Sequence, residues 1–210
     1  MTAVVAPVRA LLVDLDGVLR TWSPEIEHRA EESAGLPPGS IRRVAFRPDL
    51  LLPAITGRVA DGRWRRAVVE CLQAEYPAAA VACAVRAWSE SAGVVDPTVL
   101  ALIRACRRRV RVVLATNATS RLLEDLRHLG IDGDFDAVVN SAAVGSAKPQ
   151  GAYYAAALAA SGVPAGDAVF VDDTAANVAA ARDAGLRAYR YRGADELAWR
   201  LRECGLLAQV

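Results

Sequence analysis

The stretch that decides the fold is residues 8–18, Val-Arg-Ala-Leu-Leu-Val-Asp-Leu-Asp-Gly-Val. Its first six residues, up to Val13, are apolar apart from Arg9, as in a buried parallel β-strand. Two carboxylates and a glycine follow at once: Asp14, Asp16 and Gly17. In open α/β sheets ligands bind at the carboxyl ends of the strands, which makes this a candidate site. An acidic turn after a strand is the alternative, because Asp-Gly is a common turn pair.

Composition places the chain among globular proteins. It has 210 residues, of which 53% are apolar and 23% are charged, with a formal net charge of +1. This length suits one domain with a substantial core, or a domain with a small insertion. A charge so near zero gives no electrostatic reason to expect a nucleic acid or an anionic membrane as partner.

The same sequence predicts a cytoplasmic protein. No stretch is long and apolar enough to span a bilayer, and the first 13 residues lack the basic leading region of a cleavable signal. The four cysteines are scattered without a Cys-x-x-Cys pair: Cys71, Cys83, Cys106 and Cys204. We expect them to be small buried residues in a reducing compartment.

Residues 19–92 form a helical module in our interpretation. Turn and capping residues separate helices expected over 24–34, 41–46, 49–55 and 78–89, and Asp61 is the expected cap of one more that ends before Pro77. No stretch in this range alternates as a strand does. The module is large enough to be a small helical domain.

Helices and strands alternate from Asp96 onward. Strands are expected over 111–115, 137–139, 168–171 and 187–191, and helices over 97–108, 119–129, 151–161, 174–184 and 195–204. This rhythm predicts an α/β fold, a doubly wound parallel sheet of about five strands. We expect residues 1–18 and 93–210 to form the core, and residues 19–92 to be an insertion above the carboxyl end of the first strand, where it can act as a lid.

Three of the four expected strands after the first are followed by polar residues: Thr116-Asn117, Asn140-Ser141 and Asp172-Asp173. Parallel strands bring these ends to one edge of the sheet, where four carboxylates would repel one another. A hard divalent cation relieves that repulsion, and all-oxygen ligation favours Mg²⁺. The hydroxyl of Thr116 and the backbone N–H of Asn117 can hold an anionic oxygen. Lys148, the only lysine among 25 basic residues, can reach the same anion. Together these groups describe a phosphate site.

The order of these motifs resembles the haloacid dehalogenase-like (HAD) superfamily, specifically subfamily I with a helical C1 cap. The resemblance covers nearly the whole chain and rests on four motifs in sequence order: residues 14–19 (DLDGVL), 114–117 (LATN), 145–149 (GSAKP) and 171–177 (VDDTAAN). Within the superfamily the chain looks nearest to small sugar-phosphate phosphatases and to the phosphatase domain of soluble epoxide hydrolases.

The resemblance implies a role for each matching residue. Asp14 would be the nucleophile that forms an aspartyl-phosphate, and Asp16 would protonate the leaving oxygen and then activate water. Thr116, Asn117 and Lys148 would hold the phosphoryl group. Mg²⁺ would be bound by Asp14, by the backbone carbonyl of Asp16, and by Asp172 and Asp173, one of them directly. The superfamily's dehalogenases lack the second acid, so Asp16 favours phosphoryl chemistry.

These roles lead to a Mg²⁺-dependent phosphatase acting on a small phosphorylated metabolite such as a sugar phosphate, as a monomer or homodimer. Two alternatives stay open: a phosphomutase, and a catalytically idle phosphate-binding protein on the same fold. The insertion is expected to choose the substrate, and Trp22, Phe46 and Arg47 are the preferred contacts. The wider set of candidates adds His28, Arg42, Arg43, Arg58, Trp64 and Trp88.

Overall fold

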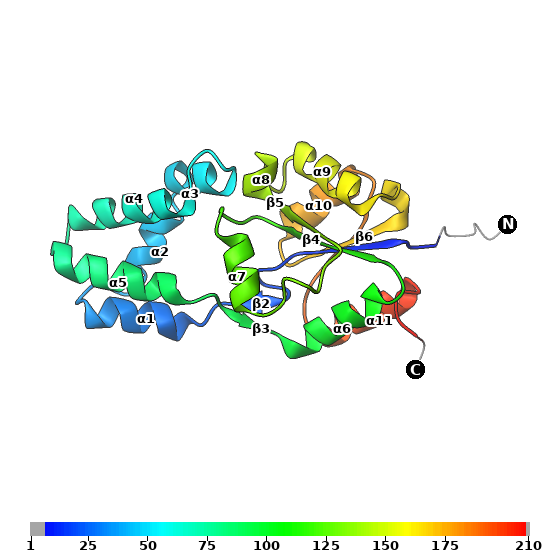
Figure 1. Ribbon diagram of the computed structural model, residues 1–210, viewed down its shortest axis with the longest axis horizontal. Coiled ribbons are helices and arrows are strands. Elements are labelled where there is room, and N and C mark those ends of the chain that lie inside the picture. The colour runs from blue at the N-terminus through cyan, green and yellow to red at the C-terminus, as the bar shows by residue number, and fades with distance from the viewer. Residues whose placement is uncertain (1–6, 209–210) are drawn as a thin grey trace.

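A central sheet of five parallel strands organises the computed structural model, which describes residues 7–208. The strand order is β5-β4-β1-β6-β7, and every neighbouring pair is parallel. The strands are β1 (Ala10–Val13), β4 (Arg111–Thr116), β5 (Ala137–Asn140), β6 (Ala168–Asp172) and β7 (Arg187–Arg190) (Figure 1). This arrangement confirms the predicted doubly wound parallel sheet. Residues 1–6 of the predicted core lie outside the described residues.

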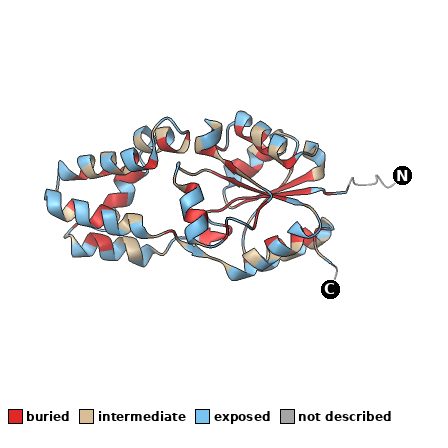
Figure 2. Cartoon of the chain, viewed as in Figure 1, coloured by how far each residue is buried: buried red, intermediate tan, exposed pale blue. Residues whose placement is uncertain are grey.

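Helices cover both faces of this sheet (Figure 1). One face is covered by α6 (Pro97–Arg107), α7 (Leu122–His128) and α11 (Ala194–Glu203), and the other by α8 (Ser141–Val144), α9 (Gly151–Ser161) and α10 (Ala175–Asp183), with a short 3-10 turn at Ala165–Asp167. In β1, Leu11 and Val13 pack into the first layer, whereas Ala10 and Leu12 pack into the second. This alternation explains why the strand is apolar throughout, and Figure 2 shows the buried residues gathered along the strands.

Five helices follow β1 and form a separate body, which we call the helical insertion: α1 (Pro24–Ser33), α2 (Ser40–Ala45), α3 (Pro48–Ile55), α4 (Asp61–Gln73) and α5 (Ala78–Glu90). They pack around their own hydrophobic cluster, in which Ile41, Trp64 and Leu72 are buried. The chain enters and leaves the helical insertion through an antiparallel pair of short strands, β2 (Arg20–Thr21) and β3 (Val94–Val95). None of the helices in the described part of the chain is long and apolar enough to cross a membrane.

The structure corrects three local predictions. We expected no strand within residues 19–92, but β2 lies there, and its two residues are too few to show alternation. Asp61 is not the cap of α4, because it is the first helical residue and its carboxylate binds Thr119 and Arg65 instead. The cysteines are not uniformly buried, since Cys83 is exposed on α5 and of the four only Cys106 is fully buried.

Candidate active site

The candidate site lies at the carboxyl edge of the three central strands. Asp14 follows β1 directly, Thr116 ends β4 and Asp172 ends β6. These strands are neighbours in the order β4-β1-β6, so the three side chains come together. All three are buried, and the sheet therefore brings together the residues that the sequence placed at one edge.

Lys148 lies at the centre of this group. Its Nζ is 2.8 Å from Asp14 Oδ1 and 2.6 Å from Asp172 Oδ2, and it donates to the carbonyl of Ala115 at 3.1 Å. The side chain of Asn117 holds the lysine backbone from both sides, accepting from its N–H at 2.8 Å and donating to its carbonyl at 3.0 Å. This positioning role of the Asn117 side chain was not predicted, because it depends on the folded path of residues 145–149.

Charge in this cluster is unbalanced toward the negative. The pKa of Asp14 is raised to about 7, mainly by burial and also by the nearby Asp172 carboxylate, whereas the Lys148 ammonium lowers it and so partly opposes both effects. One ammonium thus serves two buried carboxylates. A second cation at this place would lower the free energy of the ionised site.

The two acids at the end of β6 have different environments. Asp172 is fully buried, and its oxygens also accept from the Thr174 backbone N–H at 2.8 Å and from Asn177 Nδ2 at 3.1 Å. Asp173 is half-buried, and its carboxylate approaches the loop after β1 so closely that a Cβ on Gly17 would overlap it. Gly17 also has a φ of +77°, which L side chains rarely adopt. The glycine of the first motif is therefore needed for Asp173 to lie beside Asp14.

The donors in this cluster fit a hard cation and an oxyanion. Asp14, Asp172 and Asp173 each offer a carboxylate oxygen, and these oxygens lie within 4.8 Å of one another, which suits Mg²⁺. Thr116 Oγ1 is buried and has no hydrogen-bond partner within residues 7–208, so its hydrogen-bonding capacity is left for a ligand oxygen. The carboxylate of Asp16 is not part of this three-acid cluster. The metal ligand expected at Asp16 is its backbone carbonyl, and that role stays a prediction.

Asp16 instead turns toward the start of the helical insertion. Its carboxylate accepts from Arg20 Nε at 2.7 Å and Nη2 at 3.0 Å, and from Trp22 Nε1 at 2.7 Å. Arg20 is buried and also bonds the carbonyl of Ala92 at 3.2 Å and Asp125 Oδ2 at 3.3 Å. The sequence analysis did not identify Arg20 or Asp125, because their pairing depends on the turn at residues 17–20 and on the placement of α7.

A cavity of about 570 Å³ opens beside this acid. Asp16, Asn117 and Thr119 line its core side, and aromatic side chains line the side of the helical insertion, namely Trp22, Phe46, Trp64 and Trp88. The buried groups Asp14, Thr116 and Lys148 lie beyond this lining, so the cavity meets the candidate site at Asp16 and Asn117.

The preferred specificity residues are only partly placed as predicted. Trp22 and Phe46 line the cavity, but Arg47 does not, because its exposed guanidinium pairs with Asp49 at 2.6 Å. Of the wider set, His28, Arg42, Trp64 and Trp88 line the cavity, whereas Arg43 pairs with Glu75 and Arg58 bonds Thr56.

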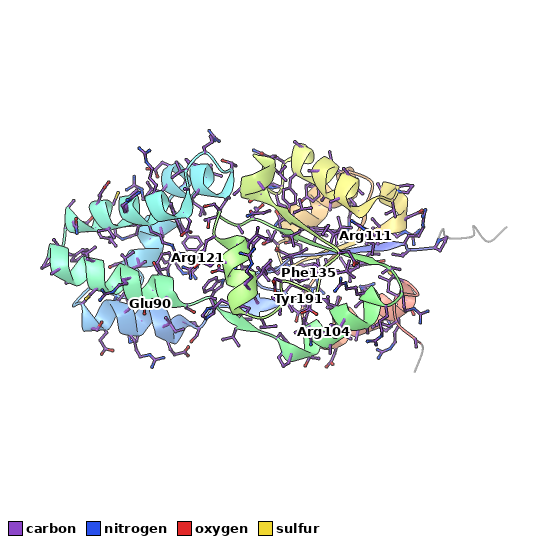
Figure 3. The ribbon with its side chains drawn as sticks, in the orientation of Figure 1. Glu90, Arg104, Arg111, Arg121, Phe135 and Tyr191 are labelled. Atoms are coloured by element: carbon purple, nitrogen blue, oxygen red, sulfur yellow. The ribbon has the colours of Figure 1, made fainter. Side chains whose placement is uncertain are left out.

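The helical insertion also contacts the loop after β4. Thr119 Oγ1 donates to Asp61 Oδ1 at 2.7 Å, and the backbone N–H of Asp61 donates to Ser120 Oγ at 3.0 Å. Arg121, which lies just before α7 and is labelled in Figure 3, donates to the carbonyl of Ser89 near the end of α5. These contacts hold the helical insertion over the carboxyl edge of the sheet.

Comparison with known proteins agrees with this architecture. The family model described as haloacid dehalogenase-like hydrolase matches residues 8–185. A predicted HAD-like family hydrolase from Porphyromonas gingivalis has a similar structure, with a TM-score of 0.72 and 24% identity over 94% of this chain and 98% of that one. The comparison with curated proteins gave no match.

Two further solved structures carry ligands. A HAD family enzyme from Bacteroides thetaiotaomicron, in complex with magnesium and inorganic phosphate, has a TM-score of 0.70 and 19% identity, covering 88% of this chain and 94% of that one. The L-2-haloacid dehalogenase from Xanthobacter autotrophicus, with chloropropionic acid covalently bound, has a TM-score of 0.65 and 21% identity, covering 96% of this chain and 85% of that one. At these identities the likeness concerns the fold.

Proposed function

The chain belongs to the haloacid dehalogenase-like hydrolases, and we propose that it is a Mg²⁺-dependent phosphatase that hydrolyses a small phosphomonoester. The observation that carries the proposal is the Lys148 ammonium between Asp14 and Asp172, together with the buried hydroxyl of Thr116, which has no hydrogen-bond partner within residues 7–208. A nucleophilic carboxylate, a fixed cation and a free hydroxyl are what phosphoryl transfer requires.

In the first step Asp14 attacks phosphorus. A bond forms between a carboxylate oxygen and phosphorus, and the ester bond to the alcohol breaks, which leaves an aspartyl-phosphate. Thr116 Oγ1, at the end of β4, and Lys148 Nζ, which reaches from the loop before α9 to 2.8 Å from Asp14 Oδ1, would hold the phosphoryl oxygens. The leaving oxygen takes its proton from Asp16, a residue of the cavity lining.

In the second step a water molecule attacks the aspartyl-phosphate. Asp16 accepts a proton from that water, inorganic phosphate leaves, and the carboxylate of Asp14 is regenerated. Mg²⁺ would be held by Asp14, Asp172 and Asp173, and it would neutralise negative charge on the phosphoryl oxygens. Arg20 and Trp22 fix the orientation of Asp16 through three hydrogen bonds, so both proton transfers depend on them.

Asp16 also favours phosphate ester hydrolysis over carbon–halogen hydrolysis, which is the chemistry named for one structural neighbour. A halide ion leaves without a proton, whereas an alkoxide needs one. A second acid in the cavity lining therefore supports an oxygen leaving group.

The test is hydrolysis of p-nitrophenyl phosphate with Mg²⁺ and with EDTA, alongside chloride release from L-2-chloropropionate. We expect Mg²⁺-dependent phosphate release, no chloride release, and loss of turnover in Asp14→Asn. Folded protein that releases no phosphate with any divalent metal would overturn the proposal, and retained turnover in Asp14→Asn would show that the nucleophile is misassigned.

A further inference from the structure

The cavity beside Asp16 has a lining whose charged groups are already paired. Asp61 binds Arg65 at 2.6 Å and Thr119 at 2.7 Å, and Asp125 binds Arg20 at 3.3 Å. Each of these acids faces a cation or hydroxyl from the protein itself. A ligand would have to break such contacts to use them.

The same holds at the side of the cavity formed by α1 and α2. The buried carboxylate of Glu31 accepts from the backbone N–H groups of Gly39 at 2.6 Å and Ile41 at 2.8 Å. Glu27 pairs with Arg42 at 3.5 Å. Among the titratable side chains that line the cavity, the exposed His28 is the one without such a partner within residues 7–208.

What the lining leaves available is aromatic and aliphatic surface. Trp22 and Phe46 are 44% and 48% exposed, although both are large and apolar residues. Trp64 and Trp88 pack edge to face at a centroid distance of 5.8 Å, and Leu51, Ile55 and Leu122 complete the apolar part. Exposed aromatic residues that gather in one cavity mark a binding surface.

Two of the three indole N–H donors in the cavity lining are also committed. Trp22 Nε1 donates to Asp16, and Trp64 Nε1 donates to the carbonyl of Ala45 at 3.2 Å. A sugar carries several hydroxyl groups, each of which needs a partner when it is buried. This cavity offers few free partners to such a ligand. It offers aromatic surface to an apolar one, because Trp22 and Phe46 stay 44% and 48% exposed although Arg20 and Arg42 stack over their rings at 4.5 Å and 4.9 Å.

We propose that the substrate is a phosphomonoester of an alcohol with an apolar, preferably aromatic, body, which this cavity takes up while the phosphoryl group reaches Asp14. The inference rests on the proposed phosphatase function and narrows it, replacing the expected sugar phosphate by a hydrophobic one. A cavity of about 570 Å³ is of the size that holds a small ligand. Its contact with Asp16 and Asn117 places the ester oxygen at the proton donor.

The test compares two primary alkyl phosphates, 2-phenylethyl phosphate and glucose 6-phosphate, whose leaving groups are both primary alkoxides. We expect kcat/KM to be at least about tenfold higher for 2-phenylethyl phosphate. Phe46→Ala should lose most of this preference, because Phe46 is 48% exposed, lines the cavity and has no part in the proposed reaction steps. Leu52→Ala is the matched control, since Leu52 is equally exposed at 48% but does not line the cavity, and it should keep the preference.

Equal or faster hydrolysis of glucose 6-phosphate would overturn the inference while leaving the phosphatase proposal intact. If neither ester nor p-nitrophenyl phosphate is hydrolysed, the phosphatase proposal fails. A binding measurement then tests by itself whether the cavity takes up an apolar ligand. For that measurement, tryptophan fluorescence of the wild-type protein and of Phe46→Ala is titrated with 2-phenylethylphosphonate. Saturable quenching that weakens in Phe46→Ala supports an apolar ligand, and no saturation, or no difference between the two proteins, contradicts it.

Discussion

Replacing Asp14 by asparagine should stabilise the metal-free protein while it abolishes turnover. Asp14 and Asp172 share the single ammonium of Lys148 in a buried cluster, so the ionised site carries an excess negative charge. Burial is the main cause that raises the pKa of Asp14 from 3.8 to about 7. An asparagine at this position would keep an oxygen that accepts from Lys148 and would remove the excess charge.

The raised pKa gives the sign and the pH range of the effect. A carboxyl whose pKa is higher in the folded state binds its proton more tightly there than in the unfolded chain. Its contribution to the free energy of unfolding is fully present below pH 3.8, falls as the pH rises through the interval up to about 7, and is lost above that value. The asparagine does not titrate, so the advantage of the variant over the wild type should grow through the same interval.

The size of the effect follows from the shift. A difference of about three pKa units corresponds to about 4 kcal/mol at full development. Neighbouring side chains relax around a buried charge, which reduces this figure. We therefore expect the free energy of unfolding of Asp14→Asn to exceed that of the wild type by between about 1 and about 4 kcal/mol at pH 8. More than half of that gain should develop between pH 5 and pH 8.

The assay is equilibrium urea unfolding followed by tryptophan fluorescence, in EDTA, at several pH values between 5 and 8.5. Lys148→Met serves as the opposite control, because it leaves two buried carboxylates without their cation and should destabilise the protein at pH 8. An Asp14→Asn variant that is less stable than the wild type at pH 8, or whose advantage is the same at pH 5 and pH 8, would refute this reasoning.

Three further outcomes can be checked on the same protein. Lys148→Arg should lower kcat on p-nitrophenyl phosphate by at least about 100-fold, because a planar guanidinium cannot replace a point charge between two carboxylates; a near-native rate would contradict this. Gly17→Ala should weaken Mg²⁺ affinity in calorimetric titration by displacing Asp173, whereas Gly130→Ala, with a φ of +67° but open space around it, should leave the affinity unchanged. Arg20→Lys should lower kcat about tenfold on alkyl phosphates and less on p-nitrophenyl phosphate, whose leaving group needs no proton; equal losses would make Arg20 merely structural.

Most of the core could be predicted because its rules are local. A run of apolar residues that ends in a carboxylate or hydroxyl marks a buried parallel strand with a ligand-facing end, and this held for β1, β4 and β6. The start of α7 shows the limit. A helix was expected from Thr119, but it begins at Leu122, because Thr119 and Ser120 bind Asp61 of the helical insertion and leave the helical path.

The cavity lining could be predicted less well, because adjacent residues that both looked suited to contact a substrate point in different directions. Phe46 and Arg47 are adjacent at the end of α2, and both were preferred contacts. The structure separates them: Phe46 lines the cavity, and Arg47 turns to Asp49 two residues later. No pattern in the sequence distinguishes the two directions, since they depend on how α2 packs against α3 and α4.

The two acids of the first motif, although one residue apart, belong to different parts of the molecule. Asp14 is fixed by the sheet, through Lys148 and its neighbour strands. Asp16 is fixed by Arg20, which also bonds the carbonyl of Ala92, so one side chain joins the acid to both chain segments that lead into the helical insertion. A Cβ at Gly93 would lie 2.8 Å from the Arg20 side chain, which shows how closely the returning segment packs on it. The position of Asp16, the proposed proton donor, is therefore tied to the position of the helical insertion, whereas that of Asp14, the proposed nucleophile, is fixed from within the core.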